Sequence, residues 1–485
     1  MQRMSTGLAD LDLVLGGGFA PGACVVLAGP PGTGKTILAQ QICFANATED
    51  HKAVYYSTMS EPYGKLVEHL APFDFFRAES IGPKVEYVHV GDLIQTTQSD
   101  GLEPLVAEIV RNAMEAEPAL VVVDSAKMLR NYAGKRGLRQ ALYNLTSRIA
   151  HSGTVLLLLG EYSPKEMRTG VEFSLADGII QLSYQPREPI DRRWLRVVKM
   201  RGGNHLEGKH TFQIRDNGFQ LYPRIEAIPL PPTSPVTGRI DSGTPSLDKL
   251  MQGGLPKGDA TLVLGPSGAG KTIFCLRYVA EGLAKGERCL YITFQDTADQ
   301  LVSMATGFGW DFETARATGQ LEISHVPMGS LDLDVLASSV RQQLAGRPVS
   351  RVVLDSLAEM VFAAREGERF PAYLRSLTGI IRGAGASKLV TGETTTLGPV
   401  KEPLHGLMFL FHNVIHLRYL EKDSEVRRAV NILKMRNSQH DKGMYLCRIT
   451  GQGLVIGDKI AGITGMLGWS ALTETEAVEE PEEAG

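Results

Sequence analysis

Strand-sized apolar runs alternate with longer helical stretches along most of the chain. The run at 25–27 precedes a glycine-rich segment and a helical stretch at 37–47, and another apolar run follows at 53–57. The same order recurs at 261–264, 273–284 and 289–293, and further strands are predicted at 121–124, 154–159, 352–355 and 388–391. Strands that alternate with helices predict an α/β fold, in which helices cover both faces of a mainly parallel twisted sheet.

Four sequence motifs occur twice, in the same order and at a nearly constant separation. They are TGLADLDLVLGGGFAPG and SGTPSLDKLMQGGLPKG, GPPGTGKT and GPSGAGKT, VVVDS and VVLDS, and KMRGGNH and KMRNSQH. The repeat is as long as a whole domain. It therefore predicts a tandem duplication rather than a solenoid of short repeats.

A proline-rich segment separates the two copies. The sequence IEAIPLPPTSPVTGR contains four prolines, which exclude a helix and favour an extended connector. The end of the chain is rich in Glu and has no hydrophobic periodicity, which is typical of disorder. We predict a first domain at 1–224, a linker at 225–240, a second domain at 241–465 and a disordered acidic tail at 466–485.

Composition narrows the class of protein. With 43% hydrophobic and 21% charged residues, the 485-residue chain has a globular composition. The net charge is −4 at pH 7, and six Glu in 474–485 leave the rest of the chain near neutral, so no global basic excess indicates nucleic-acid binding. The five Cys form no CxxC pair, which excludes a disulfide scaffold and the usual zinc spacing and fits a reducing compartment.

Two features predict a cytoplasmic protein that crosses no membrane. The N-terminal MQRMSTGLADLD lacks the basic, apolar and small-residue series of a signal peptide. The longest apolar run, at 155–159, is much shorter than the ~20 residues that span a bilayer.

Two glycine-rich loops fit the phosphate-binding pattern GxxxxGK[ST]. Their glycines let backbone N–H groups converge on phosphate oxygens, and the following helix presents its N-terminal donors to the same anion. Lys35 and Lys271 are expected to reach the terminal phosphates. The predicted nucleotide-binding residues are Gly29, Pro30, Pro31, Gly32, Thr33, Gly34, Lys35 and Thr36, and Gly265, Pro266, Ser267, Gly268, Ala269, Gly270, Lys271 and Thr272.

A carboxylate ends an apolar strand in each copy, at Asp124 and Asp355. At the carboxyl edge of a parallel sheet such a side chain can hold Mg²⁺, usually through water. The hydroxyl that follows the P-loop lysine is a second oxygen ligand. We therefore predict one magnesium site at Thr36 and Asp124 and another at Thr272 and Asp355.

The paired loops, the VVVDS and VVLDS strands and the two KMR segments together resemble the KaiC family of the RecA-like ATPase superfamily, over about residues 3–460. The resemblance implies two tandem RecA-like P-loop domains with ATP as the nucleotide. It also implies a homo-hexamer stacked as a double ring, with ATP at the subunit interfaces and an unknown regulatory protein as partner.

In proteins that resemble this one, the KMR segments reach the ATP of a neighbouring subunit. A cation supplied in this way stabilises charge on the transferring phosphoryl group. The alternative is a solvated basic strand edge. The residues concerned are Lys199, Arg201 and His205 in the first copy and Lys434, Arg436 and His440 in the second.

Both copies depart from the family at the first of two adjacent acidic positions after the second strand. The first of these positions in the family is thought to activate water or an acceptor hydroxyl. Here the two positions are predicted to be Ser60 and Glu61, and Gln295 and Asp296. A serine cannot act as a carboxylate base, and a glutamine can orient water but cannot take its proton. We therefore expect either slow hydrolysis, in which Glu61 and Asp296 assist, or ATP binding with little turnover. Because the first half has Glu61 and the complete KMRG segment, we expect it to hydrolyse ATP faster than the second half.

Two further carboxylates, Glu161 and Glu393, each follow a glycine at the end of an apolar strand. In this fold they would lie beside the strand that ends in Asp124 or Asp355. They could position water or contact the γ-phosphate, or they could bond to a neighbouring loop.

The circadian members of the family autophosphorylate a Ser–Thr pair at a fixed distance before the second KMR motif. Here those positions are Met408 and Phe409, within LMFLFHNVIHL, which predicts a buried strand. Neither residue has a hydroxyl, so clock-type autophosphorylation is not expected. The acidic tail also differs from the docking peptide of the clock proteins.

Three functions follow from these patterns. The first is a regulatory ATPase ring whose shape reports its nucleotide state to a partner. The second is a RecA-type DNA-dependent ATPase or recombination factor, which a basic cluster after the VVVDS strand would support as a DNA-binding loop. The third is a serine/threonine protein kinase. The basic cluster consists of Arg130, Tyr132, Lys135, Arg136 and Arg139.

Overall fold

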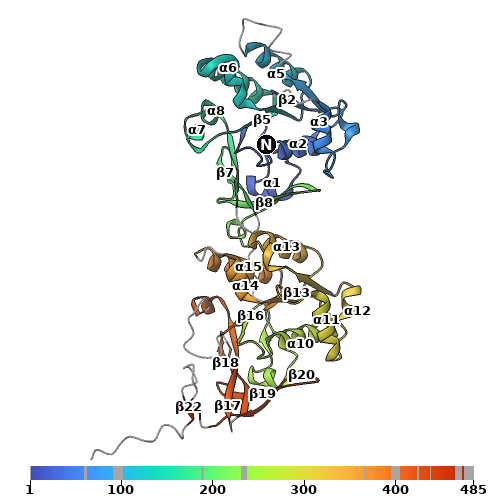
Figure 1. Cartoon of the computed structure of the whole chain (residues 1–485), viewed down its shortest axis with the longest axis vertical. Helices are drawn as coiled ribbons and strands as arrows, with labels where there is room; N and C mark the ends of the chain where they lie inside the picture. Colours follow the sequence, from blue (N-terminus) through green and yellow to red (C-terminus); the bar gives the residue numbers. More distant parts are fainter. Residues whose placement is uncertain are drawn as a thin grey trace, which may run out of the picture. The chain divides into compact units, whose positions relative to one another are not determined.

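The computed structural model describes residues 2–58, 63–90, 102–186, 191–230, 237–364, 368–394, 405–422, 425–436, 438–461, 463–464 and 472–473. The chain divides into two compact units, Met1–Ile228 and Pro229–Gly485 (Figure 1). Each unit has its own sheet and its own helices, so each is described by itself.

The first unit is built on a nine-stranded sheet in the order β3-β2-β4-β5-β1-β6-β7-β8-β9. The six strands from β3 to β6 are parallel, and β7, β8 and β9 continue the sheet antiparallel. The strands are β1 (Cys24–Ala28), β2 (Ala53–Ser57), β3 (Val85–His89), β4 (Leu120–Asp124), β5 (Val155–Gly160), β6 (Gly178–Gln185), β7 (Arg192–Met200), β8 (His210–Arg215) and β9 (Gly218–Tyr222).

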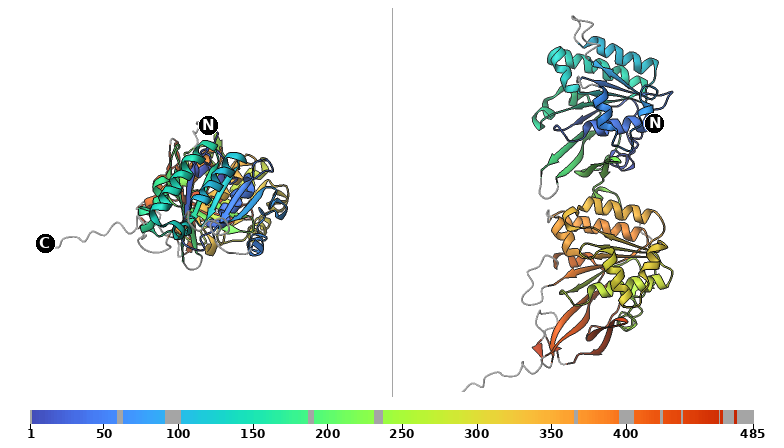
Figure 2. Two further views of the ribbon diagram at one scale, coloured as in Figure 1. Left: turned by 90° about the horizontal axis from the view of Figure 1, so that it is seen from above. Right: turned by 45° about the vertical axis from the view of Figure 1, so that its right-hand side comes forward.

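Helices cover both faces of this sheet (Figure 2). Successive side chains of a strand point to opposite faces of the sheet. In β1, Val25 and Leu27 therefore pack in one core with α1 and α2, whereas Val26 packs in another core with α5 and α6. The helices and 3₁₀ turns are α1 (Ala9–Leu15), α2 (Lys35–Asn46), α3 (Tyr63–Leu70), η1 (Ala78–Ser80), α5 (Glu103–Glu115), η2 (Ala126–Leu129), α6 (Arg130–Ser152), α7 (Pro164–Thr169), α8 (Val171–Leu175) and η3 (Ile225–Ala227).

The second unit repeats this topology in a nine-stranded sheet, β14-β13-β15-β16-β12-β17-β18-β19-β20. Its strands are β12 (Ala260–Gly265), β13 (Cys289–Thr293), β14 (Leu321–His325), β15 (Arg351–Asp355), β16 (Ser387–Glu393), β17 (Asn413–Lys422), β18 (Glu425–Met435), β19 (Met444–Thr450) and β20 (Gly453–Lys459). The helices and 3₁₀ turns are α9 (Pro245–Leu250), α10 (Lys271–Ala284), α11 (Ala298–Gly307), α12 (Phe312–Ala317), η4 (Met328–Ser330), α13 (Leu333–Ala345), α14 (Leu357–Ala364), α15 (Phe370–Gly383) and η5 (His405–Leu410).

Two short strand pairs complete the described elements. β10 (Arg239–Ile240) pairs with β11 (Leu255–Pro256), and β21 (Ile463–Thr464) pairs with β22 (Leu472–Thr473). The rest of the predicted acidic tail lies outside the described residues. None of the described helices is long and apolar enough to cross a membrane.

The predicted fold class, two tandem α/β domains with mainly parallel sheets, is confirmed. The prediction of a buried strand through LMFLFHNVIHL is wrong in its first half. There the chain forms η5, the side chain of Phe409 is 58% exposed, and β17 begins only at Asn413. An apolar run of this length cannot by itself distinguish a strand from a short helical turn.

Candidate nucleotide sites

The first P-loop connects the carboxyl end of β1 to α2. Gly34 has a positive φ of 89°, and a Cβ there would lie 2.4 Å from Ile214 Cδ1, so glycine is required at this turn. The ammonium of Lys35 donates to the carbonyl oxygens of Gly29 (3.1 Å) and Pro30 (2.8 Å). Burial lowers the pKa of Lys35, and the negative charges of Glu161 and Asp124 oppose this lowering. A phosphate anion in the loop would replace the lost hydration of this cation.

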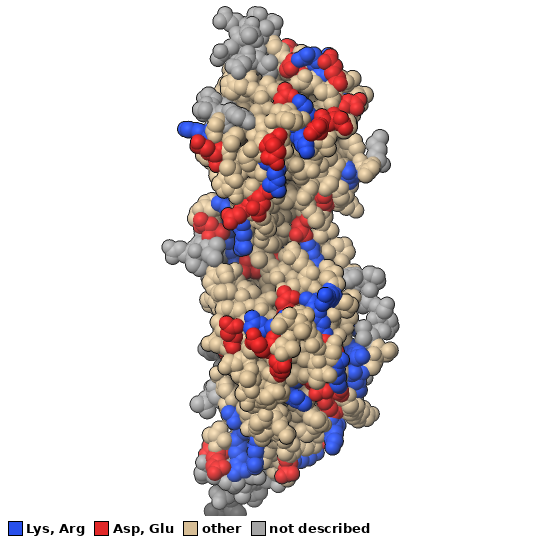
Figure 3. All heavy atoms as spheres, turned by 90° about the vertical axis from the view of Figure 1, so that its right-hand side faces the viewer, with Lys and Arg blue, Asp and Glu red and all other residues tan. Residues whose placement is uncertain are grey.

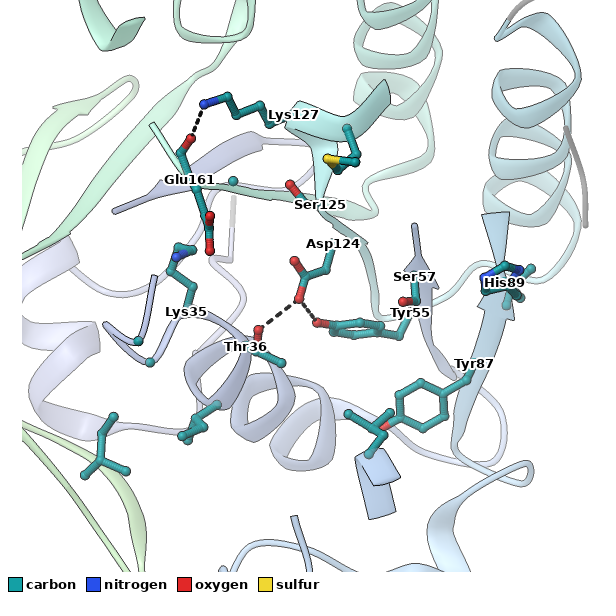
Figure 4. A pocket seen from close by; sticks show the side chains of 18 of the residues that line it. Lys35, Thr36, Tyr55, Ser57, Tyr87, His89, Asp124, Ser125, Lys127 and Glu161 are labelled. Atoms are coloured by element: carbon teal, nitrogen blue, oxygen red, sulfur yellow. Dashed lines mark hydrogen bonds between the residues drawn. The ribbon is translucent and has the colours of Figure 1, made fainter. Parts of the chain in front are cut away.

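The carboxylate of Asp124 faces this loop from the end of β4. Thr36 Oγ1 donates to Asp124 Oδ2 (2.9 Å), and the Tyr55 hydroxyl donates to the same oxygen (2.5 Å), as Figure 4 shows. A hydroxyl and a carboxylate that already contact each other are the oxygen ligands Mg²⁺ prefers. The donor set therefore fits Mg²⁺ held by Thr36 and Asp124, where the ion would neutralise phosphate charge.

The loop opens into a cavity of about 1080 Å³. Besides the predicted residues, its lining includes Glu161, Lys127, Arg193 and Ile214. Lys127 Nζ donates to the backbone oxygen of Glu161 (2.7 Å) and pairs with Glu166 (2.9 Å). Figure 4 shows the Glu161 carboxylate turned toward Lys35. Glu161 is thus within the site and not only bonded to a loop.

The second P-loop, between β12 and α10, repeats these contacts. Lys271 Nζ donates to the carbonyl oxygens of Gly265 (2.9 Å) and Pro266 (3.0 Å), and Thr272 Oγ1 donates to Asp355 Oδ2 (3.0 Å). Asp355 also accepts bonds from two residues of neighbouring strands, at Oδ2 from the Tyr291 hydroxyl (2.8 Å) and at Oδ1 from Thr391 (2.5 Å). This donor set fits Mg²⁺ in the same way.

The second cavity is smaller, about 260 Å³, and is lined by Gln295, Asp296 and Glu393 among others. Glu393 Oε1 lies 3.8 Å from Lys271 Nζ. Burial raises the pKa of Asp296, and repulsion from Asp355 raises it further, against an opposing effect of His325. Gln295, Asp296 and Glu393 therefore meet at one site, as their sequence positions predict.

Several residues of the two sites are not indicated by the sequence motifs. The hydroxyls of Tyr55 and Tyr291 donate to the strand-end carboxylates of Asp124 and Asp355. A comparison of the two copies could have found both tyrosines, because each lies two residues before the end of the second strand of its unit. Thr391 occurs in the second copy alone, and its position in the first copy is Leu159. No sequence signal indicates Thr391, because its contact depends on strand pairing.

Strand pairing also sets the register of the two acidic positions. Ser57 pairs with Asp124, and Thr293 pairs with Asp355, so Ser57 and Thr293 are equivalent. Counting onward from this pair, the counterparts of Gln295 and Asp296 are residues 59 and 60, one position earlier than predicted. By the same count the counterpart of Glu61 is Thr297. Ser60 and Glu61 both lie outside the described residues. This register removes Glu61 from the argument for a faster first half and leaves only the complete KMRG segment of that half to support it.

The KMR segments lie at the opposite edge of each sheet from their own P-loop. In the first unit, Met200 of the KMR segment lies in one row across the sheet with Gly178 and Val25, at the amino end of β1. The P-loop begins four residues after Val25, roughly 13 Å further along the strand. Lys199 Nζ donates to the carbonyl oxygen of Ala176 (2.5 Å), and Arg201 lies 3.4 Å from Asp177.

In the second unit Thr261, Asn413 and Met435 form the corresponding row. Lys434 donates to the backbone oxygen of Phe411 (2.7 Å), and Arg436 donates to that of Phe409 (2.9 Å). None of these four cations lines the cavity of its own P-loop. His205 lines a separate cavity with Arg196 and Arg224, and His440 is half-buried. Each of these four cations therefore lies away from the P-loop of its own unit.

A buried lysine at the amino edge of the second sheet, Lys388, makes the stability of the second unit depend on pH. Lys388 is 2% exposed, and burial, together with repulsion from Arg382, lowers its pKa to about 7, although Asp259 opposes the shift. In the unfolded chain the value returns to about 10.4. Between these values the unfolded chain binds a proton that the folded chain does not, so stability rises with pH and is lost as the pH falls through 7.

We expect the urea midpoint of the second unit to rise from pH 7 to pH 10, and the Lys388→Met variant to show a clearly smaller rise. Lys257→Met is the control, because Lys257 is exposed. An equal slope in wild type and Lys388→Met would contradict the assignment.

Comparison with known proteins agrees with this geometry. A model of the KaiC ATPase matches residues 4–226 and again residues 240–460. The chain belongs to the KaiC family. It therefore contains two tandem KaiC-type ATPase domains, each with a P-loop, a strand-end carboxylate and a KMR segment.

Curated relatives match over nearly the whole chain. The circadian clock protein KaiC3 of Synechocystis sp. is 28% identical over 480 residues, which cover 96% of this chain and 94% of the relative. The circadian clock oscillator protein KaiC of Picosynechococcus sp. is 25% identical over 472 residues, which cover 94% of this chain and 90% of the relative. The circadian clock oscillator protein KaiC of Thermostichus vulcanus is 25% identical over 481 residues, which cover 96% of this chain and 91% of the relative.

Proposed function

We propose that this KaiC-family protein binds ATP with Mg²⁺ in both halves, hydrolyses it slowly, and acts as a nucleotide-dependent regulatory scaffold. The subunits would assemble as a homo-hexameric double ring in the cytoplasm and present their nucleotide state to a regulatory protein. One observation carries the proposal: each sheet has at one edge a Lys, a Thr and an Asp whose arrangement fits phosphate and Mg²⁺, and at the other edge a basic KMR segment. A site that is completed by a neighbour couples ATP occupancy to assembly.

The position of the KMR cations supports action between subunits. Lys199 and Lys434 lie at the amino edge of their sheets, and burial, aided by the adjacent Arg, lowers the pKa of both. In an assembled ring these cations and the neighbouring Arg201 and Arg436 would face the terminal phosphates of the next subunit. Removing a cation that stabilises transferring phosphate commonly lowers kcat by orders of magnitude.

A mixing experiment tests this arrangement. We expect Lys271→Ala and Arg436→Ala each to lose most of the hydrolysis of the second site. If Arg436 acts on a neighbour's ATP, mixed rings contain interfaces in which an intact Lys271 meets an intact Arg436. We therefore expect a mixture of the two inactive variants, incubated to exchange subunits, to regain a substantial part of the activity.

Two controls accompany the mixture. Each variant mixed with itself should stay inactive, and light scattering should show that the rings form. No recovery from assembled mixed rings would mean that Arg436 acts in its own subunit or only in folding.

We propose that clock-type autophosphorylation is absent, although named relatives are clock proteins. Met408 and Phe409 have no hydroxyl to accept a phosphoryl group, and Phe409 is exposed beside the Arg436 contact. A kinase acting on another protein would need a base for the acceptor hydroxyl, and Gln295 cannot serve as one.

The DNA-dependent alternative has weaker support. In the predicted basic cluster Arg130 is bound by the buried Glu172 (2.8 Å), whereas Arg136, Arg139 and Tyr132 are exposed, and the Lys135 side chain lies outside the description. Figure 3 shows Lys and Arg interspersed with Asp and Glu on the face it presents. Salt-dependent binding of single-stranded DNA would favour this alternative.

A further inference from the structure

The amide of Gln295 is held by a buried carboxylate that the sequence did not indicate. Gln295 Nε2 donates to Glu359 Oε1. Glu359 lies in the first turn of α14, four residues after Asp355, and is 6% exposed. Its other oxygen accepts a bond from Ser356 Oγ (2.5 Å).

This contact fixes the orientation of the glutamine. An ionised carboxylate only accepts hydrogen bonds, so Gln295 must present its NH₂ group to Glu359. The carbonyl oxygen of the same planar amide then points away from Glu359. Gln295 itself lines the second cavity together with Lys271, Thr272 and Asp296. The amide oxygen is thus available to a donor on the cavity side.

Two hydrogen-bond donors and the amino end of a helix surround the carboxylate of Glu359. The hydroxyl of Ser356 and the amide of Gln295 both donate to it, and the amino end of α14 favours a negative charge in its first turn. Its charge also reaches the phosphate lysine. Burial lowers the pKa of Lys271, and the charges of Glu393, Asp355 and Glu359 oppose that lowering.

The first half has no such pair, which supplies an internal comparison. The residue four positions after Asp124 is Met128, which lines the first cavity and is 41% exposed. The counterpart of Gln295 by strand register is residue 59, also a methionine. Two residues that meet in the second half are therefore both replaced in the first, as expected if they act together.

We propose that Glu359 is a positioning residue that holds Gln295 so that its amide oxygen accepts a hydrogen bond from the water that attacks ATP in the second site. The water oxygen forms the new bond to the γ-phosphorus, and the bond from phosphorus to the β–γ bridging oxygen breaks with its electron pair passing to ADP. Both water protons leave on the released phosphate, so no base is required of Gln295. The inference rests on ATP hydrolysis as proposed above.

The test compares full-length variants in steady-state ATP hydrolysis with Mg²⁺, with ATP affinity measured separately. Glu359→Met introduces the residue of the first half at similar volume, and we expect kcat to fall about tenfold or more while KM and ATP affinity stay unchanged. Glu359→Gln can still accept the amide bond of Gln295, so it should retain much of the wild-type kcat. Glu313→Met makes the same change in the first turn of α12, where Glu313 is exposed and lines neither cavity, so it is the matched control and should change neither constant.

A double variant separates positioning from a general loss of structure. If Glu359 acts through Gln295, Glu359→Met should lower kcat little further in a Gln295→Ala background. Equal losses in both backgrounds, an unchanged kcat in Glu359→Met, or a raised KM with unchanged kcat would each overturn the inference. Wild type that binds ATP without hydrolysing it would overturn the proposed hydrolysis as well, which is a distinguishable result.

Discussion

Replacing Lys271 by Ala is expected to remove most ATP hydrolysis by the full chain, by roughly a hundredfold in kcat. Lys271 supplies the cation of the second P-loop, and the second site combines it with a glutamine held by Glu359, with Asp296 and with the strand-end carboxylate Asp355. Without this lysine the terminal phosphates lose their fixed positive partner. Steady-state release of phosphate, measured on assembled protein at saturating ATP, checks the result.

The matched variant is Lys35→Ala in the first half. We expect it to keep at least about half of the turnover once assembled and to weaken nucleotide-dependent assembly instead, because the first site lacks the Gln–Glu pair of the second. Light scattering on the same samples reports assembly. Turnover lost mainly in Lys35→Ala would assign hydrolysis to the first half and contradict this expectation.

Replacing Arg351 by Ala is expected to destabilise the second unit by about 3–5 kcal/mol. Arg351 is fully buried on β15, where Nε pairs with Glu287 (2.5 Å) and Nη1 donates to the carbonyl oxygens of Asp241 (2.7 Å) and Tyr278 (2.8 Å). Removal of the Arg351 side chain leaves the partly buried carboxylate of Glu287 and the two carbonyl groups without their hydrogen-bond donor. Hydrogen exchange of peptides from each unit should show the loss in the second unit only.

Two further variants control this prediction. Arg316→Ala breaks a pair with Asp299, whose side chain is 92% exposed, and should cost less than about 1 kcal/mol. The double change Arg351→Met with Glu287→Met removes both charges and should recover part of the stability. Equal losses in Arg316→Ala and Arg351→Ala would mean that burial does not determine the contribution of these pairs.

The sequence predicts the fold and half of each site for an identifiable reason. P-loops, strand-end carboxylates and KMR segments are local patterns, and their recurrence in the same order defines two equivalent domains without any structure. Thr36 and Asp124 could be placed together because the carboxyl ends of parallel strands share one edge of a sheet. The register of Ser60 and Glu61 could not be fixed, since a count along the chain does not show where the strand ends.

The amino-acid sequence alone thus determined that the protein is a tandem member of a P-loop ATPase family, and it predicted two lysines, two threonines and two aspartates as site residues. Only the tertiary structure decided which side chains from distant segments meet. It joined Tyr55 to Asp124 and Glu359 to Gln295, and it placed the KMR cations at the edge opposite their own P-loop. The physical reason is that these contacts depend on the pairing and direction of strands far apart in the chain, which no local pattern encodes.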